Sequence, residues 1–497
     1  MSGSARRYLV LGLDGGTFDL LDPLMEAGEL PFLRSLVQKG ARAPLRSVYP
    51  AKTIPAWYSF ATGKDPGELG IFGFTEPGEG PGRSRLVQSF RPQEAFWDRL
   101  SRLGKKVGVL NFPIATPYPL HGFVLPGMLS ERPSTYPTGL RDEVEAAIGS
   151  RYPGELPAFR EANRDAWIAE ATNAVAQRAK AAATLAVRHR PDFLFALFRE
   201  TDRIEHQHWA ELGRPVRAIP PDLLGFWRTV DRACQEVDTA FQSGGGAVVT
   251  LVISDHGHGA VRSDFLTNRW LARENLLVFH RPREADRRSV LSRLILNAQR
   301  LPFARRASRR LADVLRDGHF AEIAALLGGG ASFEEMAGRV DWKRTVAYSY
   351  PIPEGIYLNP FNPDLTAERR SEVLREIRRR LESYPEAKIE VLRPEEIYRG
   401  RNFQHAPALL IRVDGMTTEP RMDLSYHEPL IRDRPEFFYG SGCHRMDGIL
   451  IAAGDGVRPG ARPAPLDLLD VGPTILDGMG APSATGHSFG PELAASA

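Results

Sequence analysis

Short apolar runs recur along this chain, with segments of helical periodicity between them. The runs occupy residues 8–13, 106–111, 193–198, 248–254 and 448–453. Each has the length of a strand, and its continuous apolar character is typical of a strand buried on both faces. The intervening segments carry apolar residues at helical spacing, as at 20–40, which should end at Gly40, and at 165–189. This alternation predicts an α/β fold, a doubly wound, mostly parallel sheet flanked by helices.

The composition is that of a globular protein that binds a small molecule. The chain has 497 residues, of which 42% are hydrophobic and 25% charged, enough for one large domain with insertions or for two domains. Its 64 basic and 61 acidic residues nearly cancel, which gives no reason to expect a nucleic-acid polymer or a membrane surface as partner.

Cysteine usage and the start of the chain predict a cytoplasmic protein. Only Cys234 and Cys443 are present, which excludes a disulfide framework and fits a reducing compartment. The first apolar run, residues 8–13, is too short for the apolar core of a signal peptide and much too short to span a bilayer.

One long segment departs from the alternating pattern. Residues 281–345 are rich in arginine and helix formers and contain the loop LGGGASFEE. We expect a helical cap or lid here, inserted into a catalytic core formed by 1–280 and 346–497. The arginine-rich run could recognise phosphate, although a solvated helix face is the favoured alternative.

Aspartate and histidine residues gather where the apolar runs end. In parallel sheets, ligands bind at the carboxyl ends of the strands, so these side chains should meet at one edge. Carboxylate and imidazole together suit zinc, or manganese where carboxylate dominates. Six such residues divide into three for each of two divalent ions, which leaves positions open for a nucleophile and substrate. The six candidate ligands are Asp14, Asp202, His206, Asp255, His256 and His444.

Two further histidines lie near these candidates. His208 follows Asp202 and His206, which stand four residues apart and would share a helix face. We treat His208 as spare. His258 is expected to donate a hydrogen bond to a ligand or to be a plain loop histidine, because Asp255 and His256 already supply the ligands.

The candidate nucleophile is Thr53, in the stretch AKTIPAWYSF. It stands where a helix N-cap would be, with Pro55 in the first turn, and a simple cap is the alternative reading. A helix N-terminus attracts phosphate, and a metal can lower the pKa of the hydroxyl. Lys52 could add positive charge, while Trp57 and Phe74 are candidate apolar contacts for a substrate, although each could equally be core packing.

Together these blocks resemble the alkaline phosphatase superfamily, and within it the type I phosphodiesterase/nucleotide pyrophosphatase branch. The matching blocks are LDGG, KTIPAWYSFATGKDPGELGI, TDRIEH, SDHG and GCHR, in the family's order. The resemblance implies an alkaline phosphatase-like core, two metal ions and a threonine or serine nucleophile that forms a phospho-enzyme. It also implies the ligands: Asp202, His206 and His444 for one ion, and Asp14, Asp255, His256 and Thr53 for the other.

Several alternatives stay open at this point. Phe74 stands where nucleotide pyrophosphatases usually carry an asparagine, which weakens any transfer of their substrate preference. A phosphomonoesterase or phosphomutase on the same fold remains possible by sequence. LGLDGGT also resembles the phosphate hairpin of actin-like sugar kinases, and a non-catalytic metal-binding protein would carry the same ligands.

Overall fold

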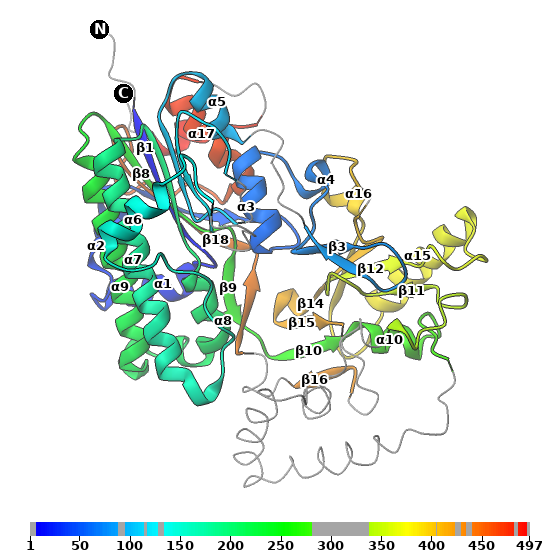
Figure 1. Cartoon of the computed structure of the whole chain (residues 1–497). Coiled ribbons are helices and arrows are strands. Elements are labelled where there is room, and N and C mark those ends of the chain that lie inside the picture. The colour runs from blue at the N-terminus through cyan, green and yellow to red at the C-terminus, as the bar shows by residue number, and fades with distance from the viewer. Residues whose placement is uncertain are drawn as a thin grey trace.

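The computed structural model describes residues 6–87, 95–113, 117–127, 134–280, 337–403, 405–422, 429–433, 440–481 and 486–494. An eight-stranded sheet runs through the larger part of the molecule, in the order β19-β2-β18-β8-β1-β7-β5-β6 (Figure 1). Its strands are β1 (Arg7–Leu13), β2 (Ala41–Arg46), β5 (Val107–Leu110), β6 (Gly122–Leu125), β7 (Phe193–Phe198), β8 (Val248–Ile253), β18 (Asp447–Gly454) and β19 (Leu466–Asp467). β1 pairs in parallel with both β7 and β8, whereas β18 is antiparallel to β2 and β8. The predicted mostly parallel sheet is confirmed.

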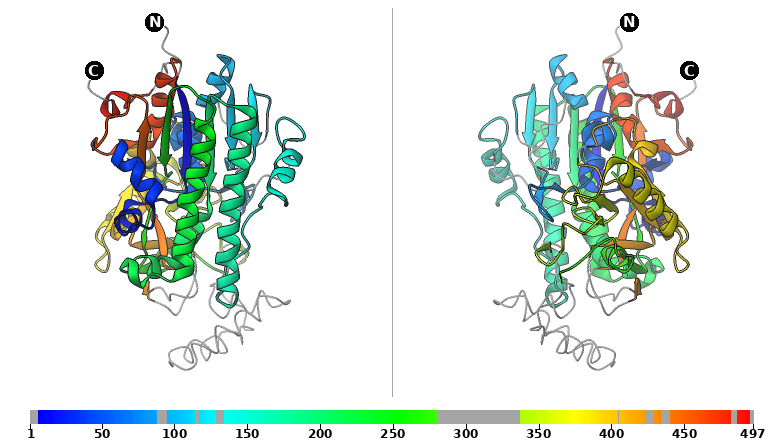
Figure 2. Two further views of the ribbon diagram at one scale, coloured as in Figure 1. Left: turned by 90° about the vertical axis from the view of Figure 1, so that its left-hand side faces the viewer. Right: turned by 90° about the vertical axis from the view of Figure 1, so that its right-hand side faces the viewer.

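Helices cover both faces of this sheet, because successive side chains of a strand point to opposite sides. Leu9 and Leu11 belong to one core cluster, and Tyr8 and Val10 to the other. The first face is covered by α1 (Phe18–Glu26), α2 (Pro31–Lys39), α6 (Leu140–Ile148), α7 (Arg164–His189) and α9 (Pro221–Gln242). The second is covered by α3 (Thr53–Thr62), α5 (Phe96–Arg102) and α17 (Val471–Gly478). Figure 2 shows the long helices α7 and α9 lying side by side across the sheet.

The two helical predictions differ in outcome. The helix expected at 165–189 is α7, with a start one residue earlier. The segment 20–40 ends at Gly40 as expected but forms two helices, α1 and α2. Gly28 adopts φ 81° between them, and Pro31 opens α2 because its missing N–H and fixed φ suit a first turn.

A second, smaller sheet was not predicted from the sequence. Its strands follow the order β11-β12-β14-β15-β10-β16, and β13 pairs with β14. They are β10 (Ser263–Leu266), β11 (Ala347–Tyr348), β12 (Gly355–Leu358), β13 (Ile389–Leu392), β14 (Leu409–Val413), β15 (Thr418–Arg421) and β16 (Ile431–Asp433). Helix α15 (Ala367–Glu382) packs on this sheet through Val373, Ile377 and Leu381.

Most of the expected cap, residues 281–336, lies outside the described residues, so the cap at 281–345 stays a prediction. The described remainder, 337–345, joins the second sheet: Ala337 and Val340 are buried in its core. Within the described ranges, no helix combines the length and the apolar character needed to cross a membrane.

A two-stranded ribbon of β9 (Gly257–Ala260) and β17 (Gly442–Arg445) lies between the two sheets (Figure 1). The strands are antiparallel, and His444 stands directly opposite His258. This pairing brings the C-terminal part of the chain to the end of β8.

Candidate metal centre

The main sheet presents its polar residues at one edge. Asp14 follows β1, Asp255 and His256 follow β8, and helix α8 (Glu200–Leu212) begins two residues after β7. β1 lies between β7 and β8, so the carboxyl ends of these three parallel strands are adjacent. The six candidate ligands expected from the sequence are therefore brought to one place: three strand ends and their following segments, with His444 added by β17.

Asp202 stands at the centre of this arrangement. Its Oδ1 lies 3.3 Å from His206 Nε2 and 3.2 Å from His444 Nε2. Asp202 also belongs to a second group, with Asp14 and His256, whose ligand atoms all lie within 4.8 Å of one another. Asp255 lies beside that second group, with its Oδ2 3.3 Å from His256 Nε2. One carboxylate is thus shared by two potential ion sites.

Three of the histidines are oriented by backbone carbonyl oxygens. The Nδ1 atoms of His206, His256 and His444 lie 3.1, 3.1 and 2.6 Å from the carbonyl oxygens of Gly442, Gly257 and Ala51. Donation from Nδ1–H leaves each Nε2 with a free lone pair directed into the cluster. This is the tautomer that a metal-binding histidine adopts.

Burial makes these charges costly without a cation. Burial, followed by repulsion from Asp202, raises the pKa of Asp14 to about 8. Burial, followed by repulsion from Asp14 and then from Asp202, raises the pKa of Asp255 well above its ordinary value. Burial alone would also raise the pKa of Asp202, but His206 and His444 lower it well below the usual range. Burial lowers the pKa of His256, so this ring is neutral.

The orphaned atoms of the site match the donor set of a divalent ion. Asp14 Oδ1, Asp202 Oδ1, Asp255 Oδ2 and His256 Nε2 are buried and have no hydrogen-bond partner among the described residues. Buried polar atoms are normally paired, and carboxylate oxygens with neutral imidazole nitrogens are the ligands of zinc and manganese. The residues therefore fit divalent metal ions.

Residues on either side of the start of α3 form hydrogen bonds with the site. The carbonyl oxygen of Ala51 accepts from His444, and the indole Nε1 of Trp57 donates to Asp14 Oδ2 over 3.2 Å. Thr53 lies between them in sequence and is buried, with 3% of its surface exposed. The N-cap is Lys52, so Thr53 is the first helical residue rather than the N-cap that the sequence predicted. Its backbone N–H is still one of the free donors of the helix start.

The three candidate substrate contacts have different environments. Lys52 lies near the site, but its Nζ pairs with Glu354 Oε1 at 2.7 Å. Trp57 has no exposed surface and packs against Phe60 and Phe195, so it orients Asp14 from the core and does not line a substrate pocket. Phe74 is partly buried and packs against the core on the α3 side of the main sheet. Core packing is therefore the better description of both aromatic residues.

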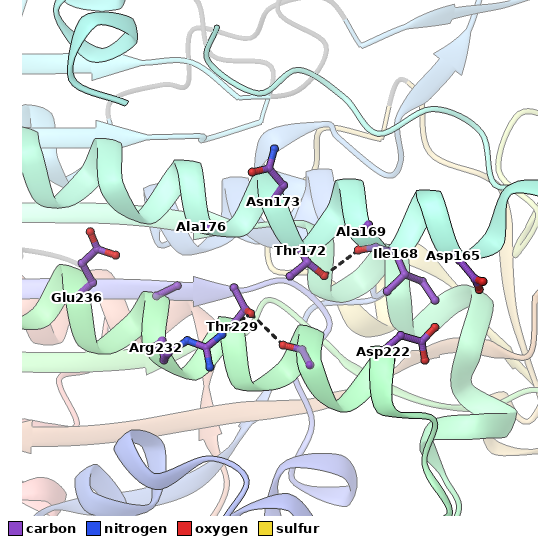
Figure 3. Close-up of a pocket in the computed structure, with 12 residues that line it drawn as sticks. Asp165, Ile168, Ala169, Thr172, Asn173, Ala176, Asp222, Thr229, Arg232 and Glu236 are labelled. Carbon is purple, nitrogen blue, oxygen red and sulfur yellow. Dashed lines mark hydrogen bonds between the residues drawn. The ribbon is translucent and has the colours of Figure 1, made fainter. Parts of the chain in front are cut away.

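A small pocket opens beside the site towards the second sheet. It has a volume of about 30 Å³, room for one or two water molecules. Lys52, His206 and His444 form one side of it, and β14 and β15 form the other. A larger groove of about 640 Å³ lies between α7 and α9 (Figure 3). None of the candidate ligands lines this groove. The volume of a cavity therefore does not identify the functional site in this protein.

The positions of two residues at the site, His258 and Glu205, were not predicted from the sequence. His258 lies on β9, not in a loop, and joins Asp202, His206 and His444 in one group of potential ligands. No local pattern places it there, because His256 precedes the strand and His258 reaches the group through its pairing opposite His444. Glu205, beside His206 in the sequence, is fully buried there, which no sequence pattern indicated.

His208 is spare, as expected. Its ring packs against Phe159 and Trp167, and its Nδ1 lies 2.7 Å from Glu211.

Comparison with known proteins assigns the chain to a family. Residues 8–418 match the family model described as type I phosphodiesterase/nucleotide pyrophosphatase. No curated protein matches the sequence.

Solved structures of 12–15% identity share the fold. Phosphonoacetate hydrolase from Sinorhizobium meliloti 1021, in complex with phosphonoformate, is 15% identical, with a TM-score of 0.55 and 96% of each chain covered. Human ectonucleotide pyrophosphatase/phosphodiesterase 5 is 12% identical, with a TM-score of 0.53 over 98% of this chain and 100% of that one. An inactive form of the murine protein in complex with AMP is 13% identical, with a TM-score of 0.52 and 97% of each chain covered. The matched residues span most of the sequence, and the chain belongs to the type I phosphodiesterase/nucleotide pyrophosphatase family of phosphoester hydrolases.

Proposed function

We propose that this protein is a metal-dependent phosphodiesterase of the nucleotide pyrophosphatase type that acts through a phospho-threonine intermediate. The observation that carries the proposal is the convergence of orphaned ligand atoms at the carboxyl ends of β1, β7 and β8, next to the buried N-terminus of α3. A family assignment alone would leave the reaction and the nucleophile open.

The proposed ligand sets follow the two clusters. Asp202, His206 and His444 would hold one ion. The second set would be Asp14, Asp255, His256 and Thr53, and Asp202 lies close enough to Asp14 and His256 to contact this ion as well. Bound zinc or manganese would supply positive charge to the phosphate oxygens and lower the pKa of the Thr53 hydroxyl.

Thr53 is the proposed nucleophile. Its Oγ1 attacks phosphorus in line with the leaving group, forming the Oγ1–P bond as the bond from phosphorus to the leaving oxygen breaks. The free N–H groups at the start of α3 and the helix dipole stabilise the negative charge that gathers on the phosphate oxygens. The leaving oxygen takes up a proton in place of the one lost by the Thr53 hydroxyl and departs as an alcohol. Water then attacks the phospho-threonine, the Oγ1–P bond breaks, and a proton from the water returns to Oγ1, which leaves a phosphomonoester and free Thr53.

The small pocket supports a diester over a monoester. A diester carries a second substituent, which needs partly apolar walls, and Tyr49, Ile411 and Met416 provide them on the side of the second sheet. Lys52 lines the same pocket and, when released from Glu354, would reach the phosphate. Because the pocket holds little more than water, we propose that the substrate displaces the Lys52–Glu354 pair on binding.

A cytoplasmic location is also part of the proposal. Cys234 and Cys443 are both buried and form no disulfide with each other, as expected for thiols in a reducing compartment. Fractionation of native cells with an antibody to the chain would test it, and recovery from the extracellular fraction would contradict it.

The decisive experiment compares esters after metal removal. The protein is treated with a chelator, resupplied with zinc or manganese, and assayed with bis-p-nitrophenyl phosphate and p-nitrophenyl phosphate. We expect no turnover without metal, recovery with either ion, and faster release of nitrophenol from the diester. Faster monoester turnover would replace the phosphodiesterase by a phosphatase. Bound metal without turnover of either ester would make the chain a binding protein.

A further inference from the structure

Glu205 and His258 form a buried acid–imidazole pair next to the candidate metal centre. Both residues have no exposed surface. Both carboxylate oxygens of Glu205 and both ring nitrogens of His258 are without a hydrogen-bond partner among the described residues. Four adjacent unsatisfied polar atoms are unusual in a folded interior, where such groups are paired with protein, water or an ion.

The ring of His258 is fixed by its neighbours. It packs edge to face on His206, with centroids 4.5 Å apart, and lies against Trp209 at 5.7 Å. The Nε2 atom lies on the side of Gly442. Nδ1 is the ring nitrogen that faces the acidic side chains of Glu205 and Asp202.

The distances from Nδ1 are those between two ligands of one ion. His258 Nδ1 lies 3.5 Å from Glu205 Oε2 and 3.7 Å from Asp202 Oδ1. Two ligands bound at about 2.1 Å in a tetrahedral arrangement lie about 3.4 Å apart. A direct N–H···O bond would be about 2.9 Å long, so the pair is too far apart for a good hydrogen bond.

Gly15 leaves a small space beside these atoms. A β-carbon at this position would lie 2.9 Å from Glu205 Oε2 and 3.1 Å from His258 Nδ1. Glycine also permits the φ of 74° found there. The absence of a side chain keeps the oxygen and the nitrogen accessible to an atom on that side.

From this geometry we propose a further cation site, formed by Glu205 Oε2, His258 Nδ1 and Asp202 Oδ1, that takes zinc or another divalent ion of similar ligand preference. Asp202 bridges it to the Asp202–His206–His444 cluster, as carboxylates do between ions about 3.5–4 Å apart. The ion would neutralise Glu205 and hold Asp202 in place between the sites. The total count of three ions rests on the two ions of the proposed function, whereas the existence of this site does not.

The test counts zinc per chain by equilibrium dialysis and elemental analysis of the full-length protein. We expect three ions for the unchanged protein and two for Glu205→Gln and for His258→Phe. His208→Gln is the matched control, a buried histidine of the same helix with its own glutamate partner, and should keep three. Glu205→Gln removes the charge while keeping the shape of the side chain.

The difference between the unchanged protein and Glu205→Gln decides the proposal. Equal zinc content in the two would overturn it, whatever the total. A fall from two ions to one would support this site and contradict the two-ion centre of the proposed function. If neither variant folds, anomalous diffraction from zinc-loaded crystals of the unchanged protein decides: a peak within about 2.2 Å of both Glu205 Oε2 and His258 Nδ1 supports the site, and filled neighbouring sites without that peak overturn it.

Discussion

His206 Nε2 and His444 Nε2 lie 2.9 Å apart, although the two residues are separated by 238 positions in the sequence. Each ring has its Nδ1 next to a backbone carbonyl oxygen, so two nitrogen lone pairs would face each other across this gap. A cation or a shared proton must lie close to both nitrogens. A bound cation is therefore expected to stabilise this pair.

Metal should stabilise the folded protein measurably. At free zinc 1,000-fold above the dissociation constant, we expect the free energy of unfolding to rise by about 4 kcal/mol per site, because only the folded chain brings these ligands together. Urea denaturation of chelator-treated and zinc-supplied protein measures the gain. His444→Ala should reduce it, whereas His189→Ala, which removes a histidine paired with Glu143 far from the centre, should not. Equal gains in the two variants would exclude His444 as a ligand.

Replacing the nucleophile should abolish turnover without loss of the fold. Thr53→Ala is expected to lower kcat by about 10³-fold or more, because the covalent route is lost. Thr62→Ala, at the other end of α3, removes a hydroxyl that donates to the carbonyl of Tyr58 and accepts from the N–H of Lys64, and it should keep full activity. Diester assays on both variants, with metal content checked, make the comparison. Near-normal turnover by a metal-loaded Thr53→Ala would mean that another group attacks phosphorus.

The shared position of Asp202 predicts a loss at two sites from one substitution. Asp202→Asn should weaken zinc binding by more than 10-fold and lower the total zinc content more than His256→Ala does, because only Asp202 belongs to both groups. Zinc titration with a competing chelator measures both affinities. Equal losses in the two variants would show that Asp202 serves one ion.

The raised pKa of Asp14 predicts how the metal-free protein responds to pH. Its folded pKa is about 8, against about 3.9 in an unfolded chain, so its contribution to stability is complete below the unfolded pKa and is lost as pH rises through 8. The pKa of Asp255 is shifted in the same direction. The lowered pKa of His256 affects stability only below its ordinary value of about 6.5, so measurements above pH 7 exclude its contribution.

Between pH 7 and 8.5, the chelator-treated protein should therefore become less stable, by up to about 1.4 kcal/mol per pH unit for each proton released. Thermal unfolding across this range measures the slope. Asp14→Asn should flatten it, and zinc should do the same by replacing the proton. A slope unchanged in Asp14→Asn would assign the effect to other groups.

A buried ion pair outside the centre predicts a loss of stability alone. Arg178 Nε donates to Glu200 at 2.9 Å, and both side chains are more than 90% buried. Arg178→Ala should lower the free energy of unfolding by about 3–5 kcal/mol, since Glu200 would remain buried without its partner. Arg188→Ala, which breaks an exposed pair with Glu143, should cost at most about 1 kcal/mol. Urea denaturation of the zinc-loaded variants provides the comparison, and equal losses would contradict it.

The main sheet and the six candidate ligands could be predicted from the sequence because each signal is local. A strand buried on both faces is a continuous apolar run, and its carboxyl end follows directly in the chain, as with β8 and Asp255. Asp202 and His206 need only the period of one helix to be placed together.

The features that were missed depend on contacts between distant segments. β11 has two residues and β14 five, too few for a clear alternation, and the second sheet joins strands from 263 to 433. His258 enters the centre through its register opposite His444, which no local pattern fixes. No local pattern marks Glu205 as buried, because its burial depends on the neighbouring chain around Gly15 and Gly442.

The small pocket draws its two walls from different parts of the fold. The side bearing His206 and His444 belongs to the metal centre, whereas β14 and β15 supply no candidate ligand. Mutations in those two strands can therefore accumulate during divergence without loss of ion binding. Related chains could exchange one ester preference for another in this way while inheriting the same reaction chemistry.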